Sequence, residues 1–189
     1  MGRQPIPIFR QGGLDGLCGA YSVVNSLTWM LESGHAHRRV PIRDNGSDLL
    51  ATLLAGLSKN QIIETIKSGA RFPRFKTFVR TGIRYIRDKY GVRIRMEIPF
   101  PQDAGSLAEL WRRAHDHNAQ FGPGSVLIGL EGLHEHWTSV NIVHERSLIL
   151  SDSSGLIKIG RKRATISEPS ASRPHKIVSR EMILLSIVE

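Results

Sequence analysis

Three residues far apart in this 189-residue chain are of the types that form a cysteine nucleophile site. Cys18 is the only cysteine, His136 begins the segment His-Trp-Thr-Ser-Val, and Asp152 begins the segment Asp-Ser-Ser-Gly. A thiol activated by an imidazole, with a carboxylate to orient that imidazole, can attack a carbonyl carbon. The residue types therefore predict nucleophilic chemistry at Cys18.

The residues that follow Cys18 favour its reactive form. A thiol attacks as the thiolate, and the free N–H groups at the start of a helix stabilise negative charge. Apolar residues recur at helical spacing after Gly16, which predicts a helix over residues 18–31 that begins at the thiol. We expect this helix, together with an imidazolium ion, to stabilise the thiolate.

His136 is the best candidate among eight histidines for that imidazolium. It begins a run that predicts a strand over 136–144, and Asp152 directly follows a second predicted strand over 147–151. A tight turn near 145–146 would make the two strands antiparallel neighbours. Asp152 would then accept a hydrogen bond from the imidazole of His136.

The elements around these residues predict an α+β fold, with helices first and an antiparallel sheet afterwards. Further helices are expected over 48–55, 59–67, 75–90 and 106–120, with Ser47, Ser58 and Ser106 as N-caps for the first, second and fourth. Further strands are expected over 92–98, 125–130, 156–159 and 182–188, and 161–176 is expected to be a surface loop. We expect one domain (1–189), with a helical lobe over about 18–120, a sheet lobe over about 121–189, and the cysteine-bearing helix packed on the sheet.

The composition is that of an ordinary globular protein, with 40% hydrophobic and 23% charged residues. One cysteine allows no intrachain disulfide, which fits a reducing compartment. No run of about 20 apolar residues predicts a transmembrane segment, and the first residues lack the apolar run of a signal peptide. We therefore expect a cytoplasmic protein, or one exported without a cleaved signal peptide.

Two other kinds of site compete with the thiol. His134 and His136 would share one face of a strand and could bind a metal, but neither His-Glu-x-x-His nor Cys-x-x-Cys is present, so no metal site is favoured. Residues 71–95 hold nine Lys or Arg against one acid, interleaved with aromatics, within a chain of net charge +9. Nucleic acid is thus a candidate partner, but we favour a solvated helix face that could attract an acidic substrate.

The chain resembles the papain-like cysteine peptidases, in the compact bacterial form related to bacteriocin-leader-processing and effector-type thiol proteases. In that family a Gln shortly precedes a Cys that opens a helix, a His begins a strand, and an Asn or Asp stands before Ser-x-Gly. Gln11, Cys18, His136 and Asp152 match this order. Gln11 stands seven positions before Cys18, one more than in papain-type enzymes, and the cysteine segment lacks the paired cysteine and aromatic of the plant and lysosomal enzymes.

The resemblance implies a papain-like fold and a protease that cleaves peptide or isopeptide bonds through a thioester, without metal or organic cofactor. Cys18 would be the nucleophile, His136 the general base and acid, and Asp152 the residue that orients the imidazole. Gln11 and the Cys18 backbone N–H would form the oxyanion hole. The substrate would be a protein or peptide.

Two alternatives remain open from the sequence. A deamidase, a transglutaminase-like enzyme or an acyltransferase could use the same three residues with another acceptor for the acyl group. A non-enzymatic binding module could use the same scaffold and rely on its basic charge.

Overall fold

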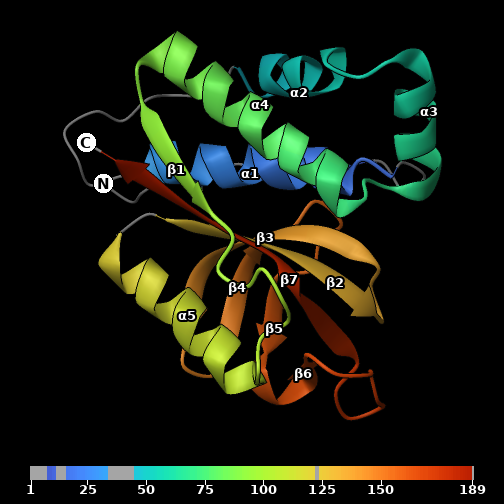
Figure 1. Ribbon diagram of the computed structural model, residues 1–189, viewed down its shortest axis with the longest axis vertical. Coiled ribbons are helices and arrows are strands. Elements are labelled where there is room, and N and C mark those ends of the chain that lie inside the picture. The colour runs from blue at the N-terminus through green and yellow to red at the C-terminus, as the bar shows by residue number, and fades with distance from the viewer. Residues whose placement is uncertain (1–7, 12–15, 34–44, 122–123, 189) are drawn as a thin grey trace.

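A single seven-stranded sheet with helices on both faces forms the framework of the molecule (Figure 1). The computed structural model describes residues 8–11, 16–33, 45–121 and 124–188. Helix and antiparallel sheet are both present, so the predicted α+β class is confirmed.

The sheet has the strand order β1-β7-β2-β3-β4-β5, and all neighbours on this path are antiparallel. The short β6 pairs parallel with β7, off this path. The strands are β1 (Arg93–Glu97), β2 (Ser125–Gly132), β3 (His136–His144), β4 (Ser147–Ser151), β5 (Lys158–Gly160), β6 (Ala164–Thr165) and β7 (His175–Val188).

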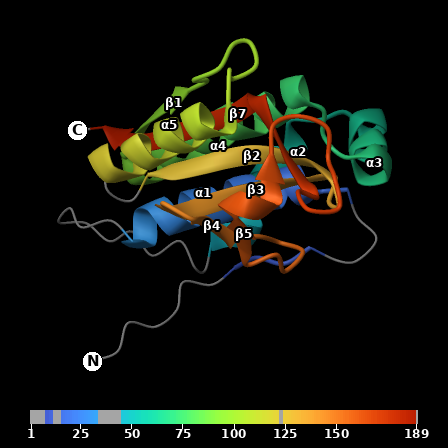
Figure 2. The ribbon, with the colours of Figure 1, turned by 90° about the horizontal axis from the view of Figure 1, so that it is seen from below.

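Helix α1 (Cys18–Ser33) is the central helix, because it packs on β3 and β2 of the sheet and also on α2 (Gly46–Ala55) and α4 (Phe72–Tyr90) (Figure 1). Its buried apolar positions include all of those that the sequence places in the core, namely Val23, Val24, Leu27, Met30 and Leu31. Helix α3 (Lys59–Ser68) follows α2, and α5 (Leu107–Gln120) packs against β3 and β7. Figure 2 shows these layers from below.

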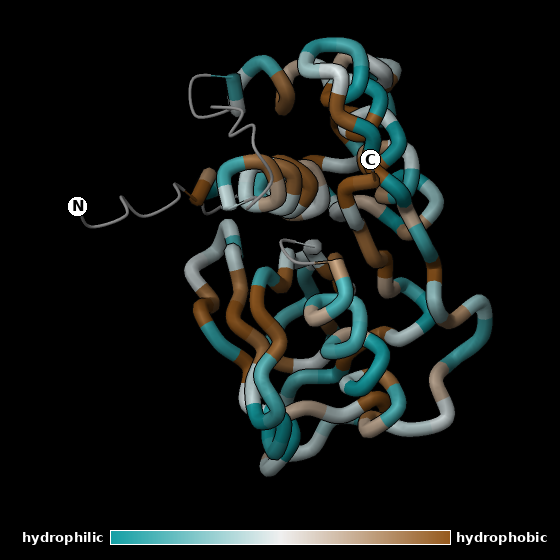
Figure 3. The backbone as a smooth tube through the Cα atoms, turned by 90° about the vertical axis from the view of Figure 1, so that its left-hand side faces the viewer, coloured by the Kyte–Doolittle hydropathy of each residue, from teal (hydrophilic) through white to brown (hydrophobic). Residues whose placement is uncertain are grey.

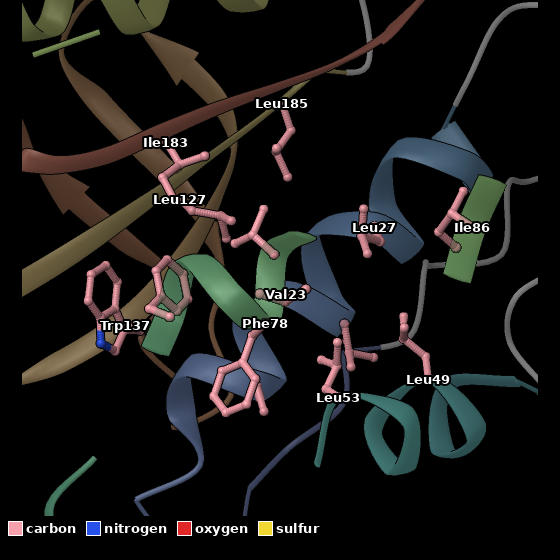
Figure 4. Packing of buried hydrophobic residues seen from close by; sticks show 14 of the residues in the cluster. Val23, Leu27, Leu49, Leu53, Phe78, Ile86, Leu127, Trp137, Ile183 and Leu185 are labelled. Carbon is pink, nitrogen blue, oxygen red and sulfur yellow. The ribbon is translucent and has the colours of Figure 1, made fainter. Parts of the chain in front are cut away.

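The sheet separates two hydrophobic cores because successive side chains of its strands point to opposite faces. On β2, Leu127 packs with α1, α2 and α4, whereas Val126 and Ile128 pack with α5. Figure 4 shows the first core, in which Leu127, Ile183 and Leu185 of the sheet meet residues of the helices. The hydrophobic segments in Figure 3 accordingly include α1 and the strands next to it.

The expected helix caps are confirmed at two of three positions. The hydroxyl of Ser58 accepts from the backbone of Gln61 in a capping box, and that of Ser106 accepts from the backbone of Glu109. The prediction for Ser47 is wrong, because α2 begins at Gly46 with Asn45 as its N-cap and Ser47 lies inside the first turn.

The prediction of a loop over 161–176 is wrong at both ends. Residues Arg161–Arg163 form a 3-10 turn that leads into β6, and β7 begins at His175, seven residues before the expected strand start. The first part of β7 pairs with β2, where Gly132 lies opposite His175. Polar residues and an irregular register along this part of β7 hide the alternation that marks a strand.

The boundary that we expected between a helical and a sheet lobe also differs from the observed packing. β1 pairs with β7 at the edge of the sheet, and α5 packs in the core on the second face. Both elements precede residue 121, yet they belong with the sheet.

Candidate active site

Cys18 is the first residue of α1, and it is buried with 7% of its surface exposed. The segment before it is held by Gly16, whose N–H donates to the Ile66 carbonyl at 2.8 Å. A Cβ at residue 16 would lie 2.7 Å from that same oxygen, so only glycine allows this close approach. The thiol is therefore fixed at the helix N-terminus, where the helix dipole favours negative charge.

His136 and Asp152 meet as the sequence predicts, at the neighbouring ends of β3 and β4. Nε2 of His136 lies 2.6 Å from Oδ2 of Asp152, and their side chains are 9% and 0% exposed. The strands pair antiparallel, with Ser139 opposite Ser151, which brings the start of β3 beside the end of β4. A buried, charge-assisted hydrogen bond thus orients the imidazole.

The His136 ring also interacts with the Cys18 side chain. Since Nε2 faces Asp152, Nδ1 is the nitrogen available to the sulfur. Burial of the ring lowers the pKa of His136, but the hydrogen bonds and charges of Asp152 and Cys18 outweigh burial and raise that pKa to about 9. The imidazole is therefore protonated at neutral pH, between two groups that carry or can carry negative charge.

Asp152 is held in its ionised form by the turn that follows it. Its Oδ1 accepts from the backbone N–H and hydroxyl of Ser154, at 2.8 and 2.6 Å, and from the N–H of Leu156 at 3.2 Å. Burial raises the pKa of Asp152, but the hydrogen bonds from His136 and Ser154 reverse this effect and hold the pKa well below its usual range. The carboxylate is thus a fixed negative charge behind His136.

Gln11 lies beside the residue that follows Asp152. The Ser153 hydroxyl donates to its Oε1 at 3.0 Å, and the Gln11 N–H donates to the Ser153 carbonyl at 3.3 Å. These bonds orient the carboxamide and bring all four of the predicted site residues into one region, on α1, β3, the end of β4 and the segment 8–11. Residues 12–15, between Gln11 and Gly16, lie outside the described part of the chain.

Asn25 is a positioning residue that sequence analysis missed. This buried residue of α1 accepts from the Phe9 N–H at 2.8 Å, and its amide donates to the carbonyls of Phe9 (3.1 Å) and Ser151 (3.4 Å). It therefore ties the segment of Gln11 to the end of the strand that precedes Asp152. A signal was present, because Asn25 is a polar residue among the apolar positions of a core helix.

Trp137, next to His136, packs in the core under the site. Its ring stacks on Phe75 with centroids 3.8 Å apart, and its Nε1 donates to the Ala70 carbonyl at 2.7 Å. A Cβ at Gly19, the residue after Cys18, would lie 3.5 Å from this indole. The indole thus supports both the start of α1 and the start of β3.

The two histidines considered for a metal have different partners. His134 stacks on His175 with centroids 5.6 Å apart, whereas His136 is bonded to Asp152. Within the described ranges, no three or more His, Cys, Asp or Glu residues are grouped so that they could hold a metal ion.

None of the helices in the described part of the chain combines the length and the apolar character that crossing a bilayer requires. Comparison with known proteins finds no matching protein family, no matching curated protein and no matching solved structure.

Proposed function

We propose that this chain is a papain-like cysteine protease that cleaves peptide or isopeptide bonds. The observation that carries the proposal is the His136 ring, which lies between the Cys18 thiol and the Asp152 carboxylate, 2.6 Å from the latter. A thiol at a helix N-terminus, an oriented imidazole and a buried carboxylate provide nucleophile, acid and orienting group. The packing of α1 on β3 is compatible with a papain-like arrangement.

The raised pKa of His136 indicates how the reaction would proceed. A thiol attacks as its thiolate, so in the proposed reaction the Cys18 sulfur attacks the carbonyl carbon beside the protonated His136 ring, and the carbonyl oxygen becomes an oxyanion. His136 then gives its proton to the amine nitrogen as the C–N bond breaks, which leaves a thioester on Cys18. Water attacks the thioester and His136 takes the proton from that water. The C–S bond then breaks, its electron pair returns to the Cys18 sulfur, and the acid product leaves.

Gln11 and the Cys18 backbone N–H are the proposed oxyanion donors. Each N–H group aimed at the developing charge contributes a large share of the rate, about 100- to 1000-fold for a single donor in other enzymes. The bond from the Ser153 hydroxyl to Gln11 Oε1 supports this role, because it fixes the orientation of the carboxamide beside Asp152.

The first test is alkylation of Cys18 by iodoacetamide between pH 5 and pH 9. Because Cys18 is the only cysteine, the adduct reports on one site. We expect rapid labelling already near pH 6 in the wild type, and loss of this acidic reactivity in His136→Ala. His144→Ala, at the exposed far end of the same strand, is the matched control and should react like the wild type. Labelling that rises only near the free-thiol value of about 8.5 in both proteins would contradict the thiolate–imidazolium pair.

The second part of the test identifies the reaction by the mass of the products. Incubation with a mixture of protein substrates should give cleaved peptides, and Cys18→Ala should give none. A mass increase of one unit without cleavage, or a cross-linked product, would contradict the protease assignment and indicate deamidation or acyl transfer.

A further inference from the structure

A cluster of positively charged side chains lies at the end of β3 opposite His136, away from the candidate active site. A concave groove of about 690 Å³ is present there, and we call it the basic groove. The nine residues of β3, at about 3.3 Å each, place it roughly 25 Å from His136. Its charged lining residues are Glu145, Arg146, Lys158, Arg161, Lys162 and Arg173.

The cations of the basic groove have no carboxylate partners in the part of the chain that the structure describes. None of the five forms an ion pair with any described residue, although Arg74, Arg113 and Lys176 elsewhere each pair with a glutamate. Five cations and the single carboxylate of Glu145 give the groove a net charge of 5 − 1 = +4. Mutual repulsion at this density is relieved by a bound anion, so the groove is electrostatically suited to a ligand with several negative charges.

Part of the basic groove is fixed by contacts that do not involve a ligand. The Arg161 N–H donates to the Arg146 carbonyl at 2.9 Å, which ties the 3-10 turn to the β3–β4 turn. The Arg161 guanidinium lies over the Trp111 ring, 5.7 Å from its centroid, and Trp111 Nε1 donates to the His144 carbonyl at 2.8 Å. Arg161, held in this way, loses little conformational freedom on binding.

We propose that the basic groove binds a compact polyanion that carries several phosphate groups. Its cations come from four separate segments (the β3–β4 turn, β5, the 3-10 turn and the loop before β7) and surround one concavity. Three of them are arginines, whose guanidinium groups match phosphate oxygens in a two-bond geometry. A soluble oligophosphate and a multiply phosphorylated lipid headgroup share this chemistry.

The exposed cations of α4 provide the contrast. Arg80, Arg84 and Arg87 are exposed and follow one another along a face of this helix. They contribute to the same net charge of +9 but do not surround a common concavity with the basic groove. Their removal therefore separates binding in the groove from attraction to the whole molecule.

The test is titration of the full chain with inorganic tripolyphosphate, by calorimetry at about 0.15 M salt, where long-range attraction is screened. Lys158→Gln/Lys162→Gln removes two exposed groove cations, and Arg80→Gln/Arg84→Gln removes two from α4 as the matched control. We expect the groove variant to bind about tenfold more weakly or worse, and the control to change by less than about twofold. Arg146→Gln, which also removes only an exposed side chain, should weaken binding as well.

Equal weakening in the groove and control variants, or no binding of tripolyphosphate, would overturn the proposal. So would tighter binding of a single-stranded oligonucleotide that depends equally on both sets of cations.

Vesicles with a multiply phosphorylated lipid, compared with phosphatidylserine vesicles of the same charge, distinguish the source of the phosphates. Binding to the former that tripolyphosphate displaces assigns a membrane ligand, and binding of tripolyphosphate alone assigns a soluble one. All measurements can use Cys18→Ala protein, so they do not depend on the chemistry at Cys18.

Discussion

The proton on His136 results from a competition between burial and neighbouring charge. Burial alone would make this imidazole neutral, yet Asp152 and Cys18 raise its pKa to about 9. The Asp152 carboxylate can do this because the turn after it supplies three hydrogen bonds to its other oxygen. The charge state of the site is therefore determined by a short loop, and not by the three site residues alone.

Substitution of Asp152 tests this competition through stability. The raised pKa of His136 stabilises the folded state fully below the unfolded value of about 6.5, and this contribution is lost as pH rises through about 9. The lowered pKa of Asp152 adds stability above about pH 3.9, which is lost as pH falls through the folded value. Asp152→Asn keeps the shape but removes the charge, so we expect it to reduce the free energy of unfolding by roughly 2–3 kcal/mol at pH 5.5.

The difference between wild type and Asp152→Asn should shrink as pH rises from 7 to 10, because His136 then loses its proton in the wild type as well. Urea denaturation at pH 5.5, 7.5 and 9.5 measures it. His136→Gln should likewise lack the fall in the free energy of unfolding that we expect for the wild type as pH rises from 7 to 10. Parallel stability curves for wild type and Asp152→Asn would show that the pair does not carry the charge that we assign to it.

The residue types of the site could be predicted from the sequence, but their supports could not. Cys18, His136 and Asp152 are recognisable because each begins or follows a periodic segment. The bonds of Asn25 to Phe9 and Ser151 span 16 and 126 positions, and no local pattern encodes them. The contact of Ser154 with Asp152 could have been predicted from the sequence, since an aspartate carboxylate often accepts a hydrogen bond from the residue two positions later and closes a turn.

At the scale of elements, the position of the thiol depends on how closely α1 and α3 approach. The backbone of Gly16 lies against the last turn of α3, at the carbonyls of Thr65 and Ile66. No side chain fits between them, so the position of the start of α1 is determined by the position of the end of α3. The placement of Cys18 is thus a property of two helices and the glycine between them.

Gly16→Ala should therefore separate the thiol from its partners. We expect it to lower the free energy of unfolding by about 1–3 kcal/mol and to reduce the labelling of Cys18 near pH 6. Gly56→Ala is the control, because a Cβ there meets no atom within 4 Å. If Gly16→Ala labels as fast as Gly56→Ala, the close approach does not position the thiol.

Elements with strong periodicity were predicted well, and elements defined by long-range pairing were not. The start of α1 and the bounds of β3 and β4 agree with the sequence prediction residue by residue. The first half of β7 was missed because its regularity comes from its pairing with β2, whose partner residues lie 43 to 49 positions earlier in the chain. Contacts of this separation leave no trace in a local window of sequence.

For the molecule as a whole, one sheet separates two hydrophobic cores and contributes side chains to both. Leu127 and Ile128 are adjacent and both fully buried, yet they belong to the core of α1 and the core of α5 respectively. Since β2 and β7 contribute to both cores, loosening either face should disturb the same strands. The two halves of the chain are therefore expected to unfold together.

Leu127→Ala and Ile128→Ala test this coupling between the two faces of the sheet. Each removes a fully buried side chain, so we expect each to lower the free energy of unfolding by about 2–5 kcal/mol. Both variants should unfold in one transition, with the same midpoint whether it is followed by tryptophan fluorescence or by far-ultraviolet circular dichroism. Trp111 reports on the α5 core and Trp137 on the α1 core, so fluorescence samples both faces. A second transition in either variant would mean that the helical and sheet parts are separate folding units, and Cys18 and His136 would then be able to part before the chain unfolds.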